Sequence, residues 1–282
     1  MSNPLTPTAE EALAEWARRV RANREQAERV REGTPSPDFY RPLAAGFRAD
    51  PRRTNEPVLD VLRSMVQRHE TWLDIGAGGG RYALPIALLA QEVIAVEPSE
   101  GMRAVLAESM AEFGVPNVRV VAETWPTATP IEADVALISH VGYDIEEIGP
   151  FLDAMERAAR RLCVAVFLER SPASMAEPFW PIVHGEPREP LPALREFIAL
   201  QLARGRLCEV QVVPREPMTH SHPEGPLTWL RQQLFVQPGS EKDARLVEAA
   251  RSLVTERDGL WAVSWEELSL GVVTWTPPRE NP

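Results

Sequence analysis

The chain has 282 residues, of which 44% are hydrophobic and 25% charged, a composition typical of a globular protein with one sizeable core and an added cap. Its formal net charge of −11 disfavours nucleic acid as a partner, because phosphates demand a basic surface. No apolar run approaches the ~18 residues that span a bilayer and neither terminus carries a signal peptide, so we expect a cytoplasmic protein without a membrane partner.

The first predicted element is an amphipathic helix over residues 8–32, which is followed by a segment rich in aromatic residues and arginines, 38–54. Leu13, Trp16 and Val20 fall near one side of the helix, whereas its arginines alternate with glutamates and predict a solvated face. The apolar side predicts packing on the body of the protein or on a second copy in a homodimer.

A glycine-rich turn follows the first predicted strand, which is the apolar run at residues 71–75. Four glycines occur within five residues, and a helix is expected to start near residue 79 and to aim its free N–H groups at an anionic group. Dinucleotide-binding proteins place G-x-G-x-x-G at such a turn. Here Arg81 stands where the third glycine of that pattern would be, and a carboxylate, Asp74, precedes the first glycine by two residues. Both departures favour a different ligand.

At this turn the chain resembles the class I S-adenosylmethionine-dependent methyltransferases. Their first motif, (hydrophobic)-D-(hydrophobic)-G-x-G-x-G, is matched at every position, by Leu73, Asp74, Ile75, Gly76, Gly78 and Gly80. The resemblance implies that Asp74, Ala77 and the glycines lie at the methionine part of S-adenosylmethionine, whose product is S-adenosylhomocysteine. From the residues alone, Asp74 has a second interpretation, as a cap for the amides of its own loop.

The second predicted strand, residues 92–96, ends at Glu97. A carboxylate at the carboxyl end of a strand can accept two ribose hydroxyls, or it can simply be solvated. The family holds the ribose with an acid at this position, and its recurring Glu-Pro-Ser-x-x-Met places the methionine near the adenine. The matching residues are Glu97, Pro98, Ser99 and Met102. Strand and acid alone would also suit NAD, so the Pro-Ser-x-x-Met continuation carries the distinction.

The turn after the third predicted strand, residues 117–121, is another candidate, because open parallel sheets bind ligands outside the carboxyl ends of their strands. It contains Glu123, Thr124 and Trp125. The resemblance implies a polar side chain here for the adenine amine and an apolar one against the ring. Trp125 is equally typical of a surface plug at the edge of the sheet.

The turn after the fourth predicted strand, residues 133–139, joins Ser139, His140 and Tyr143 at a position that the resemblance places beside the departing methyl group. Methyl transfer from a sulfonium is a direct displacement, so a base is needed only when the acceptor is a hydroxyl or a protonated amine. Imidazole has a suitable ordinary pKa for such a base, and the alternative for His140 is a hydrogen bond to the cofactor or the loop. Tyr143 could orient either ligand or act as a lid.

Two segments are expected to cover the site. In small-molecule methyltransferases of this type the segment before the first strand folds over the cofactor, so Tyr40 and Phe47 are the lid candidates, with plain packing as the alternative. Residues 171–192 contain six prolines and predict a loop over the acceptor pocket.

The remaining elements complete an α/β fold, a doubly wound Rossmann-like seven-stranded sheet with helices on both faces, an N-terminal helical extension and a C-terminal helical insertion or cap. Further strands are predicted at residues 164–168, 207–213 and 268–275, the last antiparallel between the fifth and sixth as in the family. Further helices are predicted at residues 100–113, 146–160, 191–204, 226–235 and 241–256. We expect three segments: 1–54 as N-terminal helix and lid, 55–170 as cofactor-binding core, and 171–282 as cap and closing strands.

The sequence therefore predicts an S-adenosylmethionine-dependent methyltransferase that moves a methyl group to a small-molecule acceptor by direct displacement. Two alternatives stay open, an NAD-type oxidoreductase and a non-catalytic cofactor-binding protein of the same fold. No metal is expected, because no histidines and cysteines have metal-ligand spacing, and Cys163 and Cys208 fit small buried apolar positions.

Overall fold

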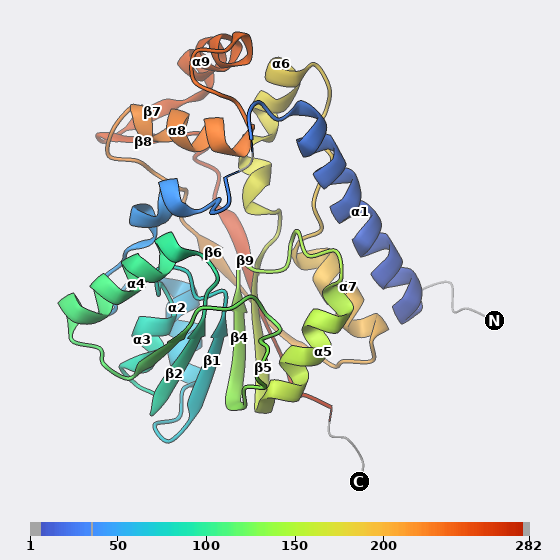
Figure 1. Ribbon diagram of the computed structural model, residues 1–282, viewed down its shortest axis with the longest axis vertical. Helices are drawn as coiled ribbons and strands as arrows, with labels where there is room; N and C mark the ends of the chain where they lie inside the picture. Colours follow the sequence, from blue (N-terminus) through green and yellow to red (C-terminus); the bar gives the residue numbers. More distant parts are fainter. Residues whose placement is uncertain (1–6, 35, 279–282) are drawn as a thin grey trace.

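Seven strands form one sheet in the computed structural model, which describes residues 7–34 and 36–278 (Figure 1). The strands are β1 (Thr71–Ile75), β2 (Glu92–Val96), β3 (Val118–Val121), β4 (Ala133–Ser139), β5 (Ala159–Leu168), β6 (Glu209–Arg215) and β9 (Leu268–Trp275). Their spatial order is β3-β2-β1-β4-β5-β9-β6, and β9 is antiparallel to both of its neighbours. The predicted fold class is thereby confirmed, including the insertion of the last strand between the fifth and the sixth.

The order of the strands reverses at β1, which pairs with β2 on one side and with β4 on the other. From this point the crossover connections run to opposite faces of the sheet, so the carboxyl ends of β1 and β4 are left open to a ligand. All the candidate turns named above lie along this edge.

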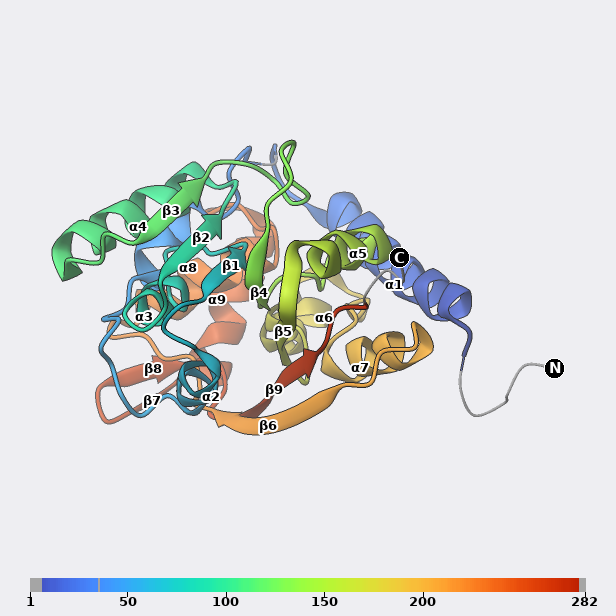
Figure 2. The ribbon, with the colours of Figure 1, turned by 90° about the horizontal axis from the view of Figure 1, so that it is seen from below.

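Both faces of the sheet are covered by helices because the parallel strands are apolar on both sides (Figures 1 and 2). Trp72 belongs to the cluster on one face and its neighbour Leu73 to the cluster on the other. The first face carries α2 (Pro57–Met65), α3 (Ala83–Ala87) and α4 (Glu100–Phe113). The second carries α5 (Ile148–Ala158) and α7 (Leu194–Ala203), with α1 (Ala9–Val30) lying across them.

Helix α1 packs on the body of the protein. The indole N–H of Trp16 donates to the carbonyl of Ile145 at 3.0 Å, and Arg19 forms an ion pair with Glu196 of α7 at 2.9 Å. This is the first of the two packing partners expected for the helix, and the homodimer stays a prediction.

The cap forms a third apolar cluster above the sheet, around the buried rings of Phe179, Trp180 and Trp229. Its elements are the 3₁₀ helix η2 (Pro172–Phe179), the helices α6 (Trp180–His184), α8 (Glu224–Gln233) and α9 (Glu241–Leu253), and the hairpin of β7 (Thr255–Arg257) and β8 (Leu260–Ala262). The lid segment contributes a further 3₁₀ helix, η1 (Arg41–Phe47), which packs on α4.

Two predictions about the cap are wrong. Residues 171–192 are not all loop, because Pro172 and Pro181 occupy first-turn positions of η2 and α6, where a missing N–H costs nothing. The helix expected over residues 241–256 ends at Leu253, since Asp258 and Gly259 both have positive φ and form the turn of the β7–β8 hairpin.

The helix after the glycine turn also starts later than predicted. Residues 79–82 continue the turn, and α3 comprises only Ala83–Ala87. A helix this short, displaced from the glycines, does not present the N-terminal anion site that was expected. Among the described residues, no helix is long and apolar enough to cross a membrane.

A buried ion network joins helix α5 to the end of α7, to the segment before β6 and to the end of β9. Glu156 of α5 is only 3% exposed, and its carboxylate accepts hydrogen bonds from Arg206 at 2.8 Å and from the indole of Trp275 at 2.9 Å. Arg204, at the end of α7, reaches the same carboxylate at 3.2 Å. Removal of this carboxylate would leave Arg206 and the indole of Trp275 without their partner, whereas Arg204 would keep its ion pair with Asp153 at 2.7 Å.

We therefore expect Glu156→Ala to lower the free energy of unfolding by about 3–5 kcal/mol, measured by urea denaturation. Glu132→Ala is the matched control, because Glu132 pairs with Arg160 on the surface, where an ion pair contributes under about 1 kcal/mol. Equal effects of the two substitutions would contradict the structural role given to Glu156.

Candidate functional site

The glycine turn is hydrogen-bonded to the end of β2. The amides of Gly76 and Ala77 donate to the carbonyl of Val96 at 2.7 and 3.2 Å. Gly76 has a φ of +75°, and a Cβ there would lie 2.5 Å from a methyl group of Val141 in the turn after β4. Glycine is required because the turns after β1 and β4 pack directly against each other.

Glu97 is the best-defined side chain of the site. Its carboxylate accepts the amide of Gly78 on one oxygen and the amide of Ser99 on the other, both at 2.8 Å. Glu97 is 6% exposed, and burial raises its pKa above the ordinary value despite these bonds. Since a carboxylate has about four acceptor positions, it can still accept two hydroxyl groups.

Asp74 and Ser139 are buried polar groups without partners among the described residues. Asp74 is 3% exposed, and its carboxylate accepts no hydrogen bond, so burial, and next the charge of Glu97, raise its pKa to about 7. The hydroxyl of Ser139 likewise has no hydrogen-bond partner. The two residues stand at the ends of the paired strands β1 and β4. The donors and acceptors of a bound ligand would satisfy buried groups of this kind.

Ser99 links helix α4 to the lid segment. Its hydroxyl accepts the amide of Met102 at 3.1 Å, which caps α4, and donates to Asp38 at 2.8 Å. Asp38 also accepts the amide of Gly101 at 3.0 Å. Met102 is buried, and its sulfur lies 3.8 Å from the position of a Cβ on Gly78. Pro98, which lies between Glu97 and Ser99 in the sequence, is exposed.

Asp38 is a residue that sequence reasoning missed. A carboxylate is favoured at the amino end of a helix, because it complements the free N–H groups and the helix dipole. No sequence spacing connects residue 38 with residues 99–101, so only the folded chain brings these groups together.

The lid segment lies over the glycine turn. The ring of Tyr40 packs edge-on to Phe47 at 6.4 Å, and the backbone oxygen of Phe47 lies 3.3 Å from the position of a Cβ on Gly79. Tyr40 is 46% exposed, and desolvation by the surrounding protein, followed by the charges of Asp144 and Glu97, raises its pKa to about 12. Its contact with a cofactor stays a prediction.

The turn after β3 is engaged with its own surroundings. Glu123 accepts the amide of Ala128 at 2.7 Å, and Thr124 is exposed. The indole of Trp125 donates to the carbonyl of Phe151 in α5 at 3.2 Å and packs on the cluster beneath that helix. These contacts are those of a plug at the sheet edge, and the adenine roles of the three residues stay predictions.

The turn after β4 holds its imidazole and phenol close together. Nδ1 of His140 lies 3.4 Å from the hydroxyl of Tyr143, which accepts the amide of Leu168 at 2.7 Å. Burial, followed by the charges of Arg215 and Arg81, lowers the pKa of His140 to about 3. Burial raises the pKa of Tyr143 above the ordinary value. Both side chains are therefore neutral at physiological pH, and they can exchange hydrogen bonds but hold no charge.

Arg81, which stands at the position of the third dinucleotide glycine, forms an ion pair with Glu56. The carboxylate of Glu56 accepts hydrogen bonds from Arg81 at 3.0 Å, from the hydroxyl of Tyr82 at 3.2 Å and from Arg53 at 2.5 Å. Glu56 precedes α2 and was not foreseen from sequence. It ties the segment before the first strand to the glycine turn.

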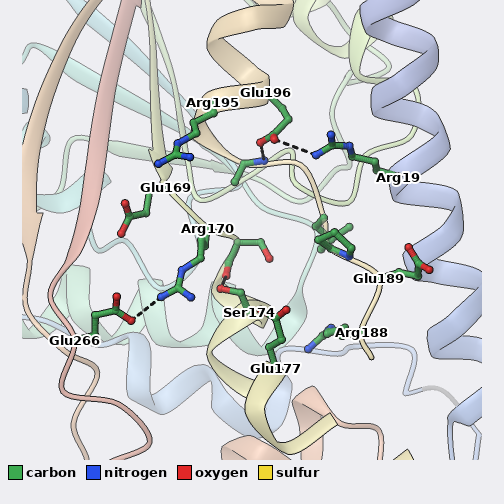
Figure 3. A pocket seen from close by; sticks show the side chains of 14 residues that line it. Arg19, Glu169, Arg170, Ser174, Glu177, Arg188, Glu189, Arg195, Glu196 and Glu266 are labelled. Carbon is green, nitrogen blue, oxygen red and sulfur yellow. Dashed lines mark hydrogen bonds and ion pairs between the residues drawn. The ribbon is translucent and has the colours of Figure 1, made fainter. Parts of the chain in front are cut away.

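Two adjoining chambers open beside the carboxyl end of β5. The larger, about 400 Å³, lies between α1, α7 and η2 and is lined by charged groups such as Arg188, Arg195 and Glu169 (Figure 3). The smaller, about 230 Å³, extends to Arg215 at the end of β6. Both are lined by Arg170, Ser174, Glu177 and Glu266. Within the described part of the chain, no three His, Cys, Asp or Glu side chains are grouped to hold a metal ion.

Comparison with known proteins connects this geometry with one family. Residues 73–167 match the family model described as a methyltransferase domain. An uncharacterized protein of Haemophilus influenzae is 31% identical over 83 residues, and this chain spans only 30% of the length of that relative and matches it over 29% of its own.

Solved structures share the fold at low sequence identity. The YcgJ protein of Bacillus subtilis is 16% identical, with a TM-score of 0.52 over 79% of this chain and 98% of that one. A candidate methyltransferase of Bacillus halodurans C-125 is 13% identical, with a TM-score of 0.55 over 79% of this chain and 100% of that one. The chain therefore matches a methyltransferase domain over residues 73–167 and shares the seven-stranded α/β fold of these solved structures.

Proposed function

We propose that this protein binds S-adenosylmethionine at the carboxyl ends of β1, β2 and β4 and transfers its methyl group to a small-molecule acceptor by direct displacement. The observation that carries the proposal is the pair of buried carboxylates, Asp74 and Glu97, at the ends of adjacent strands. An ammonium group beside Asp74 and two hydroxyls on Glu97 would satisfy both. The methionine amine and the ribose of S-adenosylmethionine supply these groups.

Asp74 argues against NAD. A pyrophosphate at this turn would meet any charge on Asp74, and like charges at short range repel. Glu97 does not distinguish the two cofactors, because dinucleotide-binding folds also hold a ribose with an acid at this position. The short helix α3 does not offset that repulsion, because it begins at Ala83 and not at the glycines. Arg81 is the nearest cation of the turn, and Glu56 already holds it.

The residues of the turns would divide the work of binding and alignment. Bound S-adenosylmethionine supplies an electrophilic methyl group on a sulfonium. We infer that Glu97 holds the ribose, that Asp74 and Ser139 hold polar groups of the methionine part, and that Met102 packs near the adenine. Tyr40 and Phe47 would close over the bound cofactor and exclude water.

His140 and Tyr143 would position the reactants. With a pKa of about 3, His140 is a weak proton acceptor at neutral pH, so it does not fit the role of general base. A neutral imidazole can still donate or accept one hydrogen bond, and its contact with Tyr143 orients both rings. Such a site suits an acceptor atom that is already nucleophilic.

A small acceptor is supported by the size of the two chambers beside the site. The two chambers have volumes of about 400 and 230 Å³, within or just below the range of small-molecule pockets. They are covered by α1, η2 and the cap, and the net charge of −11 disfavours nucleic acid.

The first test is thermal unfolding with S-adenosylmethionine, S-adenosylhomocysteine or NADH at about 100 times the expected dissociation constant. A ligand at this level stabilises the fold by about 2.7 kcal/mol, which raises the midpoint by several degrees. We expect shifts with the first two ligands and none with NADH. Glu97→Gln should reduce the shift strongly, because an amide offers the ribose hydroxyls a weaker acceptor.

Glu100→Gln is the control for Glu97→Gln, since Glu100 is an exposed acid three residues further along the chain, at the start of α4. It should leave the shift unchanged. A shift with NADH alone, or a full shift with the Glu97→Gln variant, would contradict the proposal.

The pKa of His140 predicts a second measurable effect. Its folded pKa of about 3 lies below the ordinary value of about 6.5, so the unfolded chain takes up a proton that the folded protein refuses. As pH falls from 6.5 toward 3, the wild-type protein should lose stability, by on the order of 1 kcal/mol at pH 5 after allowance for partial exposure.

His140→Gln should remove this part of the pH dependence, measured as the difference between unfolding midpoints at pH 8 and pH 5. Wild-type turnover should show no ionisation from His140 between pH 5.5 and pH 8. A turnover limb near pH 6.5 that the substitution abolishes would restore the general-base role.

A further inference from the structure

Arg215 is a partly buried cation with no carboxylate in direct contact among the described residues, and the more distant charge of Glu56 acts on it. Two partly buried arginines elsewhere meet carboxylates: Arg231 meets Asp243 at 2.8 Å, and Arg161 meets the buried Glu70. Arg215 forms no ion pair and no hydrogen bond with residues 7–34 or 36–278, and burial lowers its pKa below the ordinary value. A partly desolvated guanidinium without a partner is costly, and a bound anion offsets that cost.

The position of Arg215 connects the smaller chamber with the turn beside the proposed methyl group. It is the last residue of β6 and is paired in register with Leu268 of β9. On the other side of β9 lies the end of β5, where Leu168 donates its amide to Tyr143. Arg215 also lines the smaller chamber, and its charge acts on both His140 and Tyr143. Arg215 therefore lines the smaller chamber at the same edge of the sheet as the His140 turn.

The other arginines of the chambers are engaged except Arg195, which has no partner among the described residues but is exposed and lines only the larger chamber. Arg170 forms an ion pair with Glu266 at 2.7 Å. Arg188 donates to the carbonyl of Ala173 at 2.8 Å, and its guanidinium lies 4.5 Å from the ring centre of Trp180. Arg215 is thus the better candidate for a ligand.

The remaining lining of the smaller chamber narrows the chemistry of the ligand. Met175, Met218 and Leu268 offer apolar contact, which suits a carbon skeleton. Glu177, Glu216 and Glu266 lie along the same wall and disfavour a doubly charged group such as phosphate. One carboxylate on Arg215 with an apolar body satisfies both conditions, because guanidinium and carboxylate match in two parallel hydrogen bonds.

We propose that the methyl acceptor is a small organic monocarboxylate, with its carboxylate on Arg215 and its apolar part against Met175, Met218 and Leu268. This proposal rests on the proposed methyltransferase function and adds the substrate class. The methyl group is delivered to an acceptor held between Arg215 and the His140 turn.

The test measures binding of sodium benzoate and sodium hexanoate to protein saturated with S-adenosylhomocysteine, by isothermal titration. Benzamide, hexanamide and inorganic phosphate are the comparison probes. We expect both carboxylates to bind at least tenfold more tightly than their amides and than phosphate. Arg215→Gln should weaken carboxylate binding at least tenfold, and Arg215→Lys should restore part of it.

Arg170→Gln and Arg188→Gln are matched controls, because both arginines line the chambers but have partners. They should change carboxylate affinity less than threefold. Thermal unfolding with S-adenosylhomocysteine reports whether each variant is folded and binds the cofactor product.

Several outcomes would overturn the inference. Equal affinity for acid and amide, preference for phosphate, or loss with Arg188→Gln in place of Arg215→Gln would each do so. If Arg215→Gln instead loses S-adenosylhomocysteine, Arg215 belongs to the cofactor's own carboxylate. If the wild type binds S-adenosylhomocysteine but no carboxylate, this inference fails alone; if it binds neither, the proposed function fails with it.

Discussion

The carboxylate of Glu97 is the interaction on which the rest of the site depends. It receives the amide of Gly78 on one oxygen and that of Ser99 on the other, and so joins the glycine turn, the end of β2 and the start of α4. Ser99 in turn holds Asp38, which fixes the lid segment on α4. A single buried acid therefore positions the glycine turn relative to the lid segment. Each of its two hydrogen bonds holds a backbone amide that has no other partner among the described residues.

This arrangement gives up stability for binding. Two carboxylates, Asp74 and Glu97, are buried at neighbouring strand ends, and burial raises the pKa of both. Asp74 lacks even a hydrogen bond among the described residues, whereas a carboxylate selected for stability alone would be paired or exposed. Sites that bind polar ligands commonly hold such groups ready, and the ligand satisfies them.

The antiparallel strand β9 decides what stands on the acceptor side. Inserted between β5 and β6, it sets the end of β6 two strands away from β5 and brings Arg215 to the same edge as the His140 turn. The cap elements lie above the sheet (Figure 1), and Ser174 and Glu177 of η2 line both chambers. The core of the domain and the acceptor chambers thus have different origins, one in the parallel strands and the other mainly in the segments that follow β5.

The sequence by itself determined the features that depend on neighbours along the chain. The glycine turn, the acid at the end of β2 and the alternation of strands and helices were all predicted, because each follows from residues within about 20 positions. The ends of the elements were less certain: α3 begins late and η2 and α6 replace a loop, since proline can start a helix as well as prevent one. Only the tertiary structure decided the partners that lie far apart in sequence. Asp38 with Gly101, Glu56 with Arg81, the contact of Trp125 with α5, and Arg215 without a partner depend on how distant segments pack, and no local pattern of side chains encodes that packing.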